Sequence, residues 1–232
     1  MVLKRHLKRI VASRFWPIAR KKSMFVIRPY PSGLSMDYTL PLGFVLKEII
    51  KIARNNKEAK YLISNKKVLI NNKAVSDVKS PLKLFDTLSV PEMDKYYRIS
   101  LSNKGKLILV DIDADEAKKT ISKIINKRLI KKGRTQFNFM DGTNLLSEEN
   151  YPMKSTIVFE LPSRKVLSIL TFEPGSKLFV IKGSHIGSIV TLKEIRDRGD
   201  SFVVDADGNE FLSSDESLIV IGKDSPMIKL ND

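Results

Sequence analysis

The chain has no cysteine and only two histidines among its 232 residues. The lack of cysteine rules out disulfides, thiolate zinc sites and cysteine nucleophiles. The two histidines, His6 and His185, lie in different segments, and neither has the neighbours of a catalytic relay or a metal-binding pair. A phosphate-binding loop of the GxxxxGK(S/T) kind is also missing. The sequence therefore predicts no catalytic residues, no metal, no cofactor and no small-molecule substrate.

Long apolar runs are missing too. No run of about 18 apolar residues is available to span a membrane, and no apolar run of signal-peptide length lies near the start. Apolar residues nevertheless make up 42% of the sequence, which is enough to build a buried core. We therefore expect a folded protein of one large domain or about two to four small ones, without a membrane partner.

Acidic residues are absent from the first 36 positions, the first being Asp37. Over the whole chain, 41 Lys and Arg stand against 26 Asp and Glu, a net charge of +15. Residues 1–28 are the most basic segment, whereas residues 173–232 carry more acidic than basic residues. Such an excess of positive charge favours the binding of polyanions, nucleic acid first and anionic membranes second. A solvated lysine-rich tail and a mitochondrial presequence are the alternatives for the basic segment.

The first 39 residues combine this charge with several aromatic rings. Pro17, Pro29 and Pro31 interrupt any long helix, so we expect an extended, irregular basic arm. Cations bind phosphates, and flat rings stack on unpaired bases. Their combination favours RNA as the polyanion. The predicted RNA contacts of this arm are Lys4, Arg5, His6, Lys8, Arg9, Arg14, Trp16, Arg20, Lys21, Lys22 and Arg28.

Residues 40–91 have the pattern of a compact α/β module. Apolar residues between positions 42 and 53 follow helical spacing, with Thr39 as the expected helix cap and Pro41 in the first turn. We expect Asn56 to cap a second, shorter helix.

The second half of this module predicts β-structure. Residues 68–75 have the pattern of a hairpin around Asn71-Asn72, because asparagine is the non-glycine residue that best tolerates the positive φ angles of a tight turn. Residues 84–90 would form its closing strand.

Residues 92–172 predict a central mixed α/β domain. A helix is expected after Asp113 and Glu116, which resemble a capping box, because apolar residues from Ala117 to Leu129 follow helical spacing and Gly133 suits the helix end. Strands are expected on both sides of this helix, at residues 97–101, 107–110, 156–161 and 166–172.

The charged residues of this predicted helix each allow two interpretations. The acidic cluster from Asp111 to Glu116 could hold a divalent cation, but helix capping and the helix dipole explain the same residues without one. Basic residues at the end of a helix either form a solvated face favoured by the dipole or contact RNA. The candidate contacts are Lys127, Arg128, Lys131, Lys132 and Arg134.

Residues 173–232 predict a small closed barrel, because five short strand patterns alternate with turn signals, one of them at Asp207-Gly208. The expected strands are 177–181, 188–195, 201–205, 210–212 and 218–221.

Two segments resemble known RNA-associated modules. Residues 56–63 with 68–75 and 85–90 resemble the S-four RNA-binding module, although Asn72 and Phe85 replace glycines of that pattern. In this module a basic helix face contacts the RNA backbone, and the resemblance implies that role for Lys57, Lys60, Lys66 and Lys67.

Residues 180–190 resemble a KOW motif. Gly183 and Gly187 would be its turn glycines, and Gly187 would let the chain turn between barrel strands without a Cβ clash. On this reading, Lys182 and His185 would form one RNA-facing edge of an otherwise peripheral barrel.

The order of these segments resembles the small-subunit ribosomal protein family S-four-e of archaea and eukaryotes. The opening Lys4-Arg5-His6-Leu7-Lys8-Arg9 is similar to that family's start, and later landmarks are Leu40-Pro41-Leu42, Asp141-Gly142-Thr143, Asp205–Asn209 and Val220–Lys223. The resemblance covers essentially the whole chain. It looks more archaeal than eukaryotic, since no basic tail follows the last strand.

The resemblance implies an α+β fold with four segments: a basic N-terminal extension (1–39), an S-four-type module (40–91), a central α/β domain (92–172) and a KOW-type barrel (173–232). It also implies a structural, non-catalytic protein of the cytoplasmic small ribosomal subunit, whose partners are small-subunit ribosomal RNA and neighbouring ribosomal proteins. The alternatives are a ribosome assembly or transcription factor and an RNA-modifying enzyme.

Overall fold

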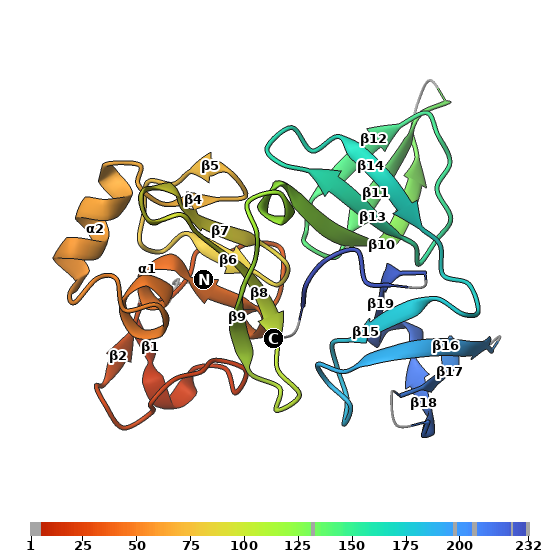
Figure 1. Cartoon of the computed structure of the whole chain (residues 1–232), viewed down its shortest axis with the longest axis horizontal. Helices are drawn as coiled ribbons and strands as arrows, with labels where there is room; N and C mark the ends of the chain where they lie inside the picture. Colours follow the sequence, from red (N-terminus) through yellow and green to blue (C-terminus); the bar gives the residue numbers. More distant parts are fainter. Residues whose placement is uncertain (1–5, 131–132, 197–198, 206–207, 224, 231–232) are drawn as a thin grey trace. The chain divides into compact units, whose positions relative to one another are not determined.

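The computed structural model describes residues 6–130, 133–196, 199–205, 208–223 and 225–230 (Figure 1). The chain divides into two compact units. The N-terminal unit comprises residues 1–100 and 106–118, and the C-terminal unit comprises residues 101–105 and 119–232. Both consist mostly of β-strands with few helices, so the predicted α+β class is confirmed in part and contains more helix than the structure has.

The N-terminal unit contains a five-stranded sheet with the strand order β5-β4-β7-β8-β9. Its strands are β4 (Leu69–Ile70), β5 (Lys73–Ala74), β7 (Thr87–Val90), β8 (Lys95–Leu101) and β9 (Leu107–Asp111). Two strand pairs accompany it: β1 (Leu7–Lys8) with β2 (Phe25–Val26), and β3 (Thr39–Pro41) with β6 (Pro81–Lys83). The strands predicted at 97–101 and 107–110 are confirmed by β8 and β9.

The first predicted helix begins later than expected. Thr39 lies in β3, where it pairs with Lys83, so the prediction that it caps a helix is wrong. Helical backbone starts at α1 (Leu42–Phe44) and continues as a π-helical stretch, η3 (Val45–Ile49). The helical spacing of the apolar residues was nevertheless informative, because α1 and the start of η3 are buried in the core of the unit.

The second helix, α2 (Asn56–Ser64), confirms the prediction with its cap displaced by one residue. The cap is Asn55 rather than Asn56: its side-chain oxygen accepts hydrogen bonds from the backbone N–H groups of Lys57 and Glu58, both at 2.9 Å. Figure 1 shows α2 next to α1 in the N-terminal unit.

The hairpin predicted around Asn71-Asn72 is also confirmed. These two residues join β4 to β5 with φ angles of 51° and 57°, the left-handed region that asparagine tolerates. Phe85, which replaces a glycine of the S-four pattern, takes the same region with φ 69°, and its ring is buried. The closing strand therefore begins at Thr87 instead of position 84, because the chain turns at Phe85.

Residues 6–39 are largely irregular, as predicted, but they fold onto the N-terminal unit, so the prediction of an extended arm is wrong for them. β1 pairs antiparallel with β2, with Leu7 opposite Val26. A 3-10 turn, η1 (Arg9–Val11), follows β1. This short ribbon fixes the positions of the basic side chains around it.

The ring of Trp16 holds the segment against the core. It is 0% exposed, and its centroid lies 5.8 Å from that of Phe44. The indole Nε1–H donates a hydrogen bond of 3.0 Å to the carbonyl oxygen of Met36. A buried tryptophan needs such a partner for its N–H group. Trp16 therefore stabilises the fold and does not offer a free face for stacking on a base.

The C-terminal unit contains two five-stranded sheets with the orders β12-β11-β10-β13-β14 and β18-β17-β16-β15-β19. The first comprises β10 (Lys119–Leu129), β11 (Thr135–Phe139), β12 (Asn144–Ser147), β13 (Thr156–Glu160) and β14 (Val166–Leu170). The second comprises β15 (Lys177–Val180), β16 (Ile189–Ile195), β17 (Asp200–Val204), β18 (Glu210–Ser214) and β19 (Leu218–Gly222). The seven strands predicted at 156–161, 166–172 and between residues 177 and 221 correspond to β13 to β19.

The helix predicted after Asp113 is wrong, because residues 119–129 form the strand β10. Only a 3-10 turn, η5 (Glu116–Lys118), precedes it. β10 pairs with β13 over its first half and with β11 over its second half. Apolar residues four apart, such as Ile121 and Ile125, fit one face of either a helix or a strand, and β-branched residues such as Thr120 and Ile121 favour the strand. The predicted central α/β domain therefore lacks its helix.

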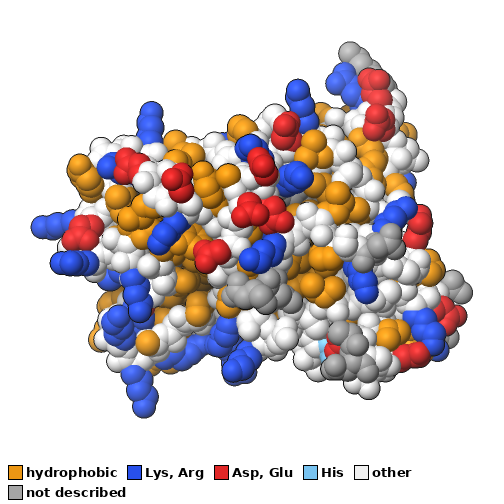
Figure 2. All heavy atoms as spheres, viewed as in Figure 1, with side chains coloured by type: hydrophobic (Ala, Val, Ile, Leu, Met, Phe, Trp, Pro, Cys, Tyr) orange, Lys and Arg blue, Asp and Glu red, His pale blue; other side chains and the backbone are white. Residues whose placement is uncertain are grey.

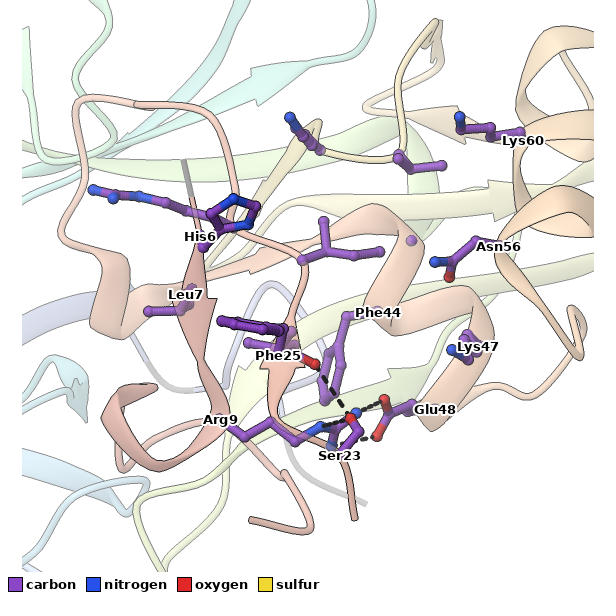
Figure 3. Close-up of a pocket in the computed structure, with 16 residues that line it drawn as sticks. His6, Leu7, Arg9, Ser23, Phe25, Phe44, Lys47, Glu48, Asn56 and Lys60 are labelled. Atoms are coloured by element: carbon purple, nitrogen blue, oxygen red, sulfur yellow. Dashed lines mark hydrogen bonds and ion pairs between the residues drawn. The ribbon is translucent and has the colours of Figure 1, made fainter. Parts of the chain in front are cut away.

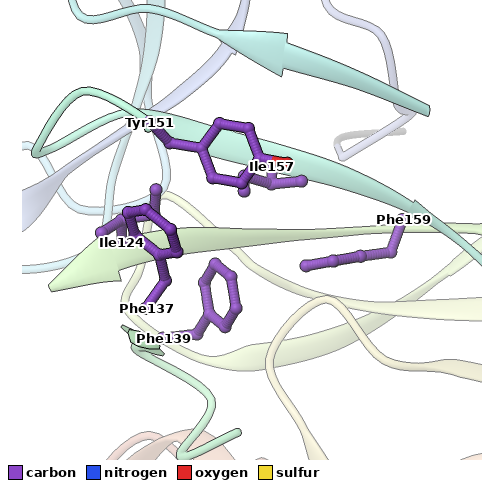
Figure 4. Close-up of a cluster of buried hydrophobic side chains, with 6 residues drawn as sticks. All are labelled: Ile124, Phe137, Phe139, Tyr151, Ile157 and Phe159. Atoms are coloured by element: carbon purple, nitrogen blue, oxygen red, sulfur yellow. The ribbon is translucent and has the colours of Figure 1, made fainter. Parts of the chain in front are cut away.

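A cluster of buried aromatic and apolar side chains forms the hydrophobic core beside the first of these sheets (Figure 4). The rings of Phe139 and Phe159 meet edge to face with centroids 5.2 Å apart, and those of Phe137 and Tyr151 lie 4.9 Å apart. Edge-to-face and tilted rings of this kind stabilise a core beyond their buried area. The cluster consists of Ile124, Phe137, Phe139, Tyr151, Ile157 and Phe159.

Gly187 occupies a tight turn before β16, as the KOW resemblance implies. Its φ is +81°, and a Cβ atom there would lie 2.5 Å from the backbone of Ser102, which belongs to the same unit. Gly183 has φ +103°, but a Cβ atom there would meet nothing within 4 Å. The two glycines therefore share the backbone constraint and differ in the space around them.

This difference predicts unequal effects of alanine. Gly187→Ala should lower the free energy of unfolding by about 1–3 kcal/mol more than Gly183→Ala, because only the former also creates an overlap with backbone. Urea unfolding of both variants measures the difference. Equal losses would show that the contact with Ser102 does not constrain the turn.

A buried lysine joins β10 to Asp215 and to the first residue of β19. The Lys123 ammonium donates to the carbonyl oxygens of Asp215 and Leu218, the latter at 2.7 Å. The Asp215 carboxylate in turn accepts from Lys154 and Ser201. Burial lowers the pKa of Lys123 to about 8, and the opposing attraction of Asp215 only partly offsets it.

The lowered pKa of Lys123 predicts a pH dependence of stability. Between about pH 8 and 10.5 the unfolded chain binds a proton at this lysine that the folded chain has released, so the free energy of unfolding should rise with pH across that window. Lys123→Met should lack this rise. Denaturant unfolding of both proteins at several pH values tests it, since titrations shared by the two cancel. Parallel curves would contradict the assignment.

Candidate nucleic-acid interface

Exposed cations of the N-terminal unit concentrate around β1 and β2 and on α2. In Figure 2, Lys and Arg side chains gather at the lower left, over the region of β1 and β2, with few Asp or Glu among them. Side chains in such a group can each neutralise an RNA phosphate. The exposed predicted contacts here are His6, Lys8, Arg14, Lys21 and Lys22. The predicted contacts Lys4 and Arg5 lie outside the described residues.

Arg9, by contrast, is buried in an ion pair. Its guanidinium donates to both carboxylate oxygens of Glu48, and its Nε–H donates to the Ser23 hydroxyl at 2.7 Å. The Arg9 and Glu48 side chains are 4% and 12% exposed. A two-pronged pair at this depth ties the ribbon to η3. Arg9 therefore holds the basic segment in place and does not face an RNA backbone.

Arg20 acts in the same way on the loop before β2. It donates hydrogen bonds to the carbonyl oxygens of Ile10, Ala12 and Ser13 at 2.7, 3.2 and 3.2 Å. Its charge thus orders neighbouring backbone. Of the predicted RNA contacts in this segment, Arg9, Trp16 and Arg20 are bound to the protein itself.

The lysines implied by the S-four resemblance surround α2 and the turn after it. Lys57, Lys60 and Lys66 are exposed, and none of the three pairs with a carboxylate among the described residues. Lys67 pairs with Glu92 at 3.0 Å, and this hydrogen bond raises the pKa of Lys67. Three cations on this face are therefore available to phosphates.

A pocket of about 560 Å³ lies in the N-terminal unit (Figure 3). Figure 3 shows His6 and Phe25 on one side, Lys47, Asn56 and Lys60 on the other, and Phe44 between them. Lys47 and Lys79 line the pocket although no sequence pattern marked them. Their placement depends on how η3 and the segment before β6 fold together, which residue spacing alone does not reveal.

The basic residues around the β10–β11 connection lie on a strand pair instead of a helix. Lys127, Arg128 and Arg134 are exposed there, and the Lys127 ammonium donates to the Asn150 side chain at 3.3 Å. Leu129 is 74% exposed beside them. The predicted contacts Lys131 and Lys132 fall outside the described residues.

Lys182 and His185, which were predicted to share one RNA-facing edge of the barrel, lie in different surroundings. Lys182 is exposed, whereas the His185 ring stacks on Phe211 with centroids 3.8 Å apart and planes 12° from parallel. One face of His185 is thereby occupied within the protein. Lys182 is the more accessible of the two residues for an external anion.

Residues of the acidic cluster from Asp111 to Glu116 have partners within the protein. Asp115 pairs with Lys118 at 2.8 Å, and the Asp113 carbonyl accepts from the Ala117 backbone. Within the described ranges, no group of three or more His, Asp or Glu side chains is arranged to hold a metal ion. Likewise, no helix in the described part of the chain is long and apolar enough to cross a membrane.

Comparison with known proteins gives matches over nearly the whole chain. Residues 93–166 match the pattern described as "Ribosomal family S4e", and residues 1–31 match the "RS4NT (NUC023) domain". The chain is 35% identical over 228 residues to "Small ribosomal subunit protein eS4" of Methanocella arvoryzae, covering 97% of both chains. It is 34% identical over 194 residues to the protein of the same name from Nanoarchaeum equitans, covering 83% of both.

The chain belongs to the S4e family of ribosomal proteins. The resemblance inferred from the residues is thereby confirmed, and with it the prediction of a structural, non-catalytic member of the small ribosomal subunit. A solved structure agrees at the level of the fold. The crystal structure of the 30S ribosomal protein S4e from Thermoplasma acidophilum matches with a TM-score of 0.69 and 21% identity, covering 80% of this chain and 96% of that one.

Proposed function

We propose that the chain binds small-subunit ribosomal RNA through the basic surface of its N-terminal unit and supports translation as a fixed part of the particle. The observation that carries this proposal is the fold of residues 6–39 onto the unit. It turns a run of basic residues into a set of cations held at defined positions, beside the exposed lysines of α2.

The mechanism is charge neutralisation combined with shape recognition. Exposed cations near β1 and β2 meet phosphates, and binding releases the counterions that those phosphates held. The internal bonds of Arg9 and Arg20 pre-order this surface, so less conformational entropy is lost when the RNA binds. Lysines of α2 would contact the backbone of folded RNA, whose shape rather than sequence is read.

The four segments have different parts in this proposal. Residues 1–39 act as a basic extension and residues 40–91 as the S-four-type module. The central segment 92–172 is divided between the two units, and its part in the C-terminal unit would contact RNA through Lys127, Arg128 and Arg134. The acidic segment 173–232 is a peripheral KOW-type barrel with Lys182 at its RNA-facing edge, and neighbouring ribosomal proteins would meet it.

Sedimentation tests this function directly. Salt-washed small subunits should retain the chain in a one-to-one ratio with their ribosomal RNA, because recognition of the folded RNA's shape adds to the salt-sensitive phosphate contacts. Release at moderate salt, with the chain found mainly on immature particles, would support an assembly factor instead. A base modification made by the purified chain on ribosomal RNA would support an RNA-modifying enzyme.

A further inference from the structure

The pocket of the N-terminal unit joins the two segments that carry the proposed RNA binding. Its walls come from β1 and β2 on one side and from α1, η3 and the start of α2 on the other. His6 and Arg28 of the basic extension line it together with Lys60 of α2. A ligand in this pocket would therefore touch both segments at once.

The inner surface of the pocket is aromatic and apolar. Leu7 and Phe44 are 7% and 2% exposed, so they form a buried floor. Phe25 remains 49% exposed, and the His6 ring lies 5.5 Å from it. Flat rings at the wall of a pocket offer the surface on which an unpaired base stacks.

The charge of the pocket favours an anion. Lys47, Lys60 and Lys79 line it, and among the described lining residues the only carboxylate is that of Glu48. Both oxygens of this carboxylate accept hydrogen bonds from Arg9, so its charge is compensated. Lys47 and Lys60 form no ion pair with any described residue. The field of the pocket therefore attracts phosphate.

We infer that this pocket accepts one unpaired nucleotide of the bound RNA, with its base against Phe25 and its phosphates near Lys47 and Lys60. The inference rests on the proposed RNA-binding function and deepens it. The volume of about 560 Å³ falls within the range of roughly 300–1,000 Å³ that small-molecule pockets occupy. An acidic peptide would use the cations but has no need of the rings, which favours a base as the occupant.

Affinity measurements on the full chain test this pocket. Phe25→Ala should bind single-stranded octauridylate about tenfold more weakly than the unmodified chain, because one base loses its stacking partner. Binding of a charge-matched RNA duplex should change by less than about twofold, since duplex bases do not leave the stack. Leu167→Ala is the control, because Leu167 is 50% exposed and lies on β14, outside the pocket. Ultraviolet cross-linking of octauridylate should label the peptide that contains Phe25.

Two results would overturn the inference. One is an unchanged affinity of Phe25→Ala for octauridylate together with no cross-link at that peptide. The other is an equal weakening of octaglutamate binding by Phe25→Ala, which would assign the pocket to an acidic peptide. If the unmodified chain bound neither RNA, the proposed function would fail as well. If it bound both RNAs and Phe25→Ala had no effect, only the pocket assignment would fail.

Discussion

Replacing Lys8, Arg14, Lys21 and Lys22 together by glutamine should flatten the salt dependence of RNA binding. These side chains are exposed on the N-terminal unit, and each is expected to neutralise one phosphate. The slope of log K against log salt concentration should become less steep by about 3, since each lost phosphate contact removes roughly 0.7–0.9. Filter binding of small-subunit ribosomal RNA at four or five salt concentrations measures the slope.

The matched control removes the same charge elsewhere. Lys95, Lys104, Lys165 and Lys223 are also exposed, and replacing all four by glutamine should change the slope much less. Equal slopes for the two quadruple variants would show that net charge alone governs binding. The basic surface around β1 and β2 would then have no special role.

Trp16→Ala should lower the free energy of unfolding of the N-terminal unit by about 3–5 kcal/mol. The ring is fully buried against Phe44, and its N–H group has a partner in the carbonyl of Met36. Truncation therefore leaves a cavity and an unpaired carbonyl. Guanidinium unfolding followed by circular dichroism measures the loss.

Trp16→Phe separates packing from hydrogen bonding. It keeps a ring in the cavity and should be less destabilising than Trp16→Ala. If Trp16→Ala cost under about 1 kcal/mol but weakened RNA binding, the ring would be a base-stacking residue, as the sequence pattern predicted, and its buried position would be contradicted. Deleting residues 1–36 cannot make this distinction, because the deletion removes the core ring and the exposed cations together.

Local signals in the sequence predicted much of the fold. The helix α2, the hairpin at Asn71-Asn72 and the strands of the second C-terminal sheet follow from caps, turn residues and alternation, all of which act over a few residues. β10 could not be predicted in this way. The spacing of Ala117, Ile121 and Ile124 fits a helical face, and the choice of strand depends on pairing with β11 and β13, which lie further along the chain.

The sequence predicts which segments carry the candidate site, but it does not predict which of their basic side chains are exposed. Charge located the basic residues, whereas their accessibility depends on partners far away in the sequence. Arg9 is neutralised by Glu48, 39 residues later, and no local pattern announces that pair. The pocket was missed for the same reason, because Phe25 and Lys47 become neighbours only when β2 packs near η3. The S-four resemblance pointed to the α2 lysines, whose exposure the structure shows.

Lysine acetylation of intact, salt-washed small subunits tests the central claim most directly. Lys8, Lys21, Lys22, Lys57, Lys60 and Lys66 should react in the free chain, because all are exposed, and be protected in the particle by RNA phosphates. Lys165, which is exposed and assigned neither to RNA nor to a neighbouring ribosomal protein, should react in both. Equal reactivity of the first group in the free chain and the particle would contradict the assignment of this surface to ribosomal RNA.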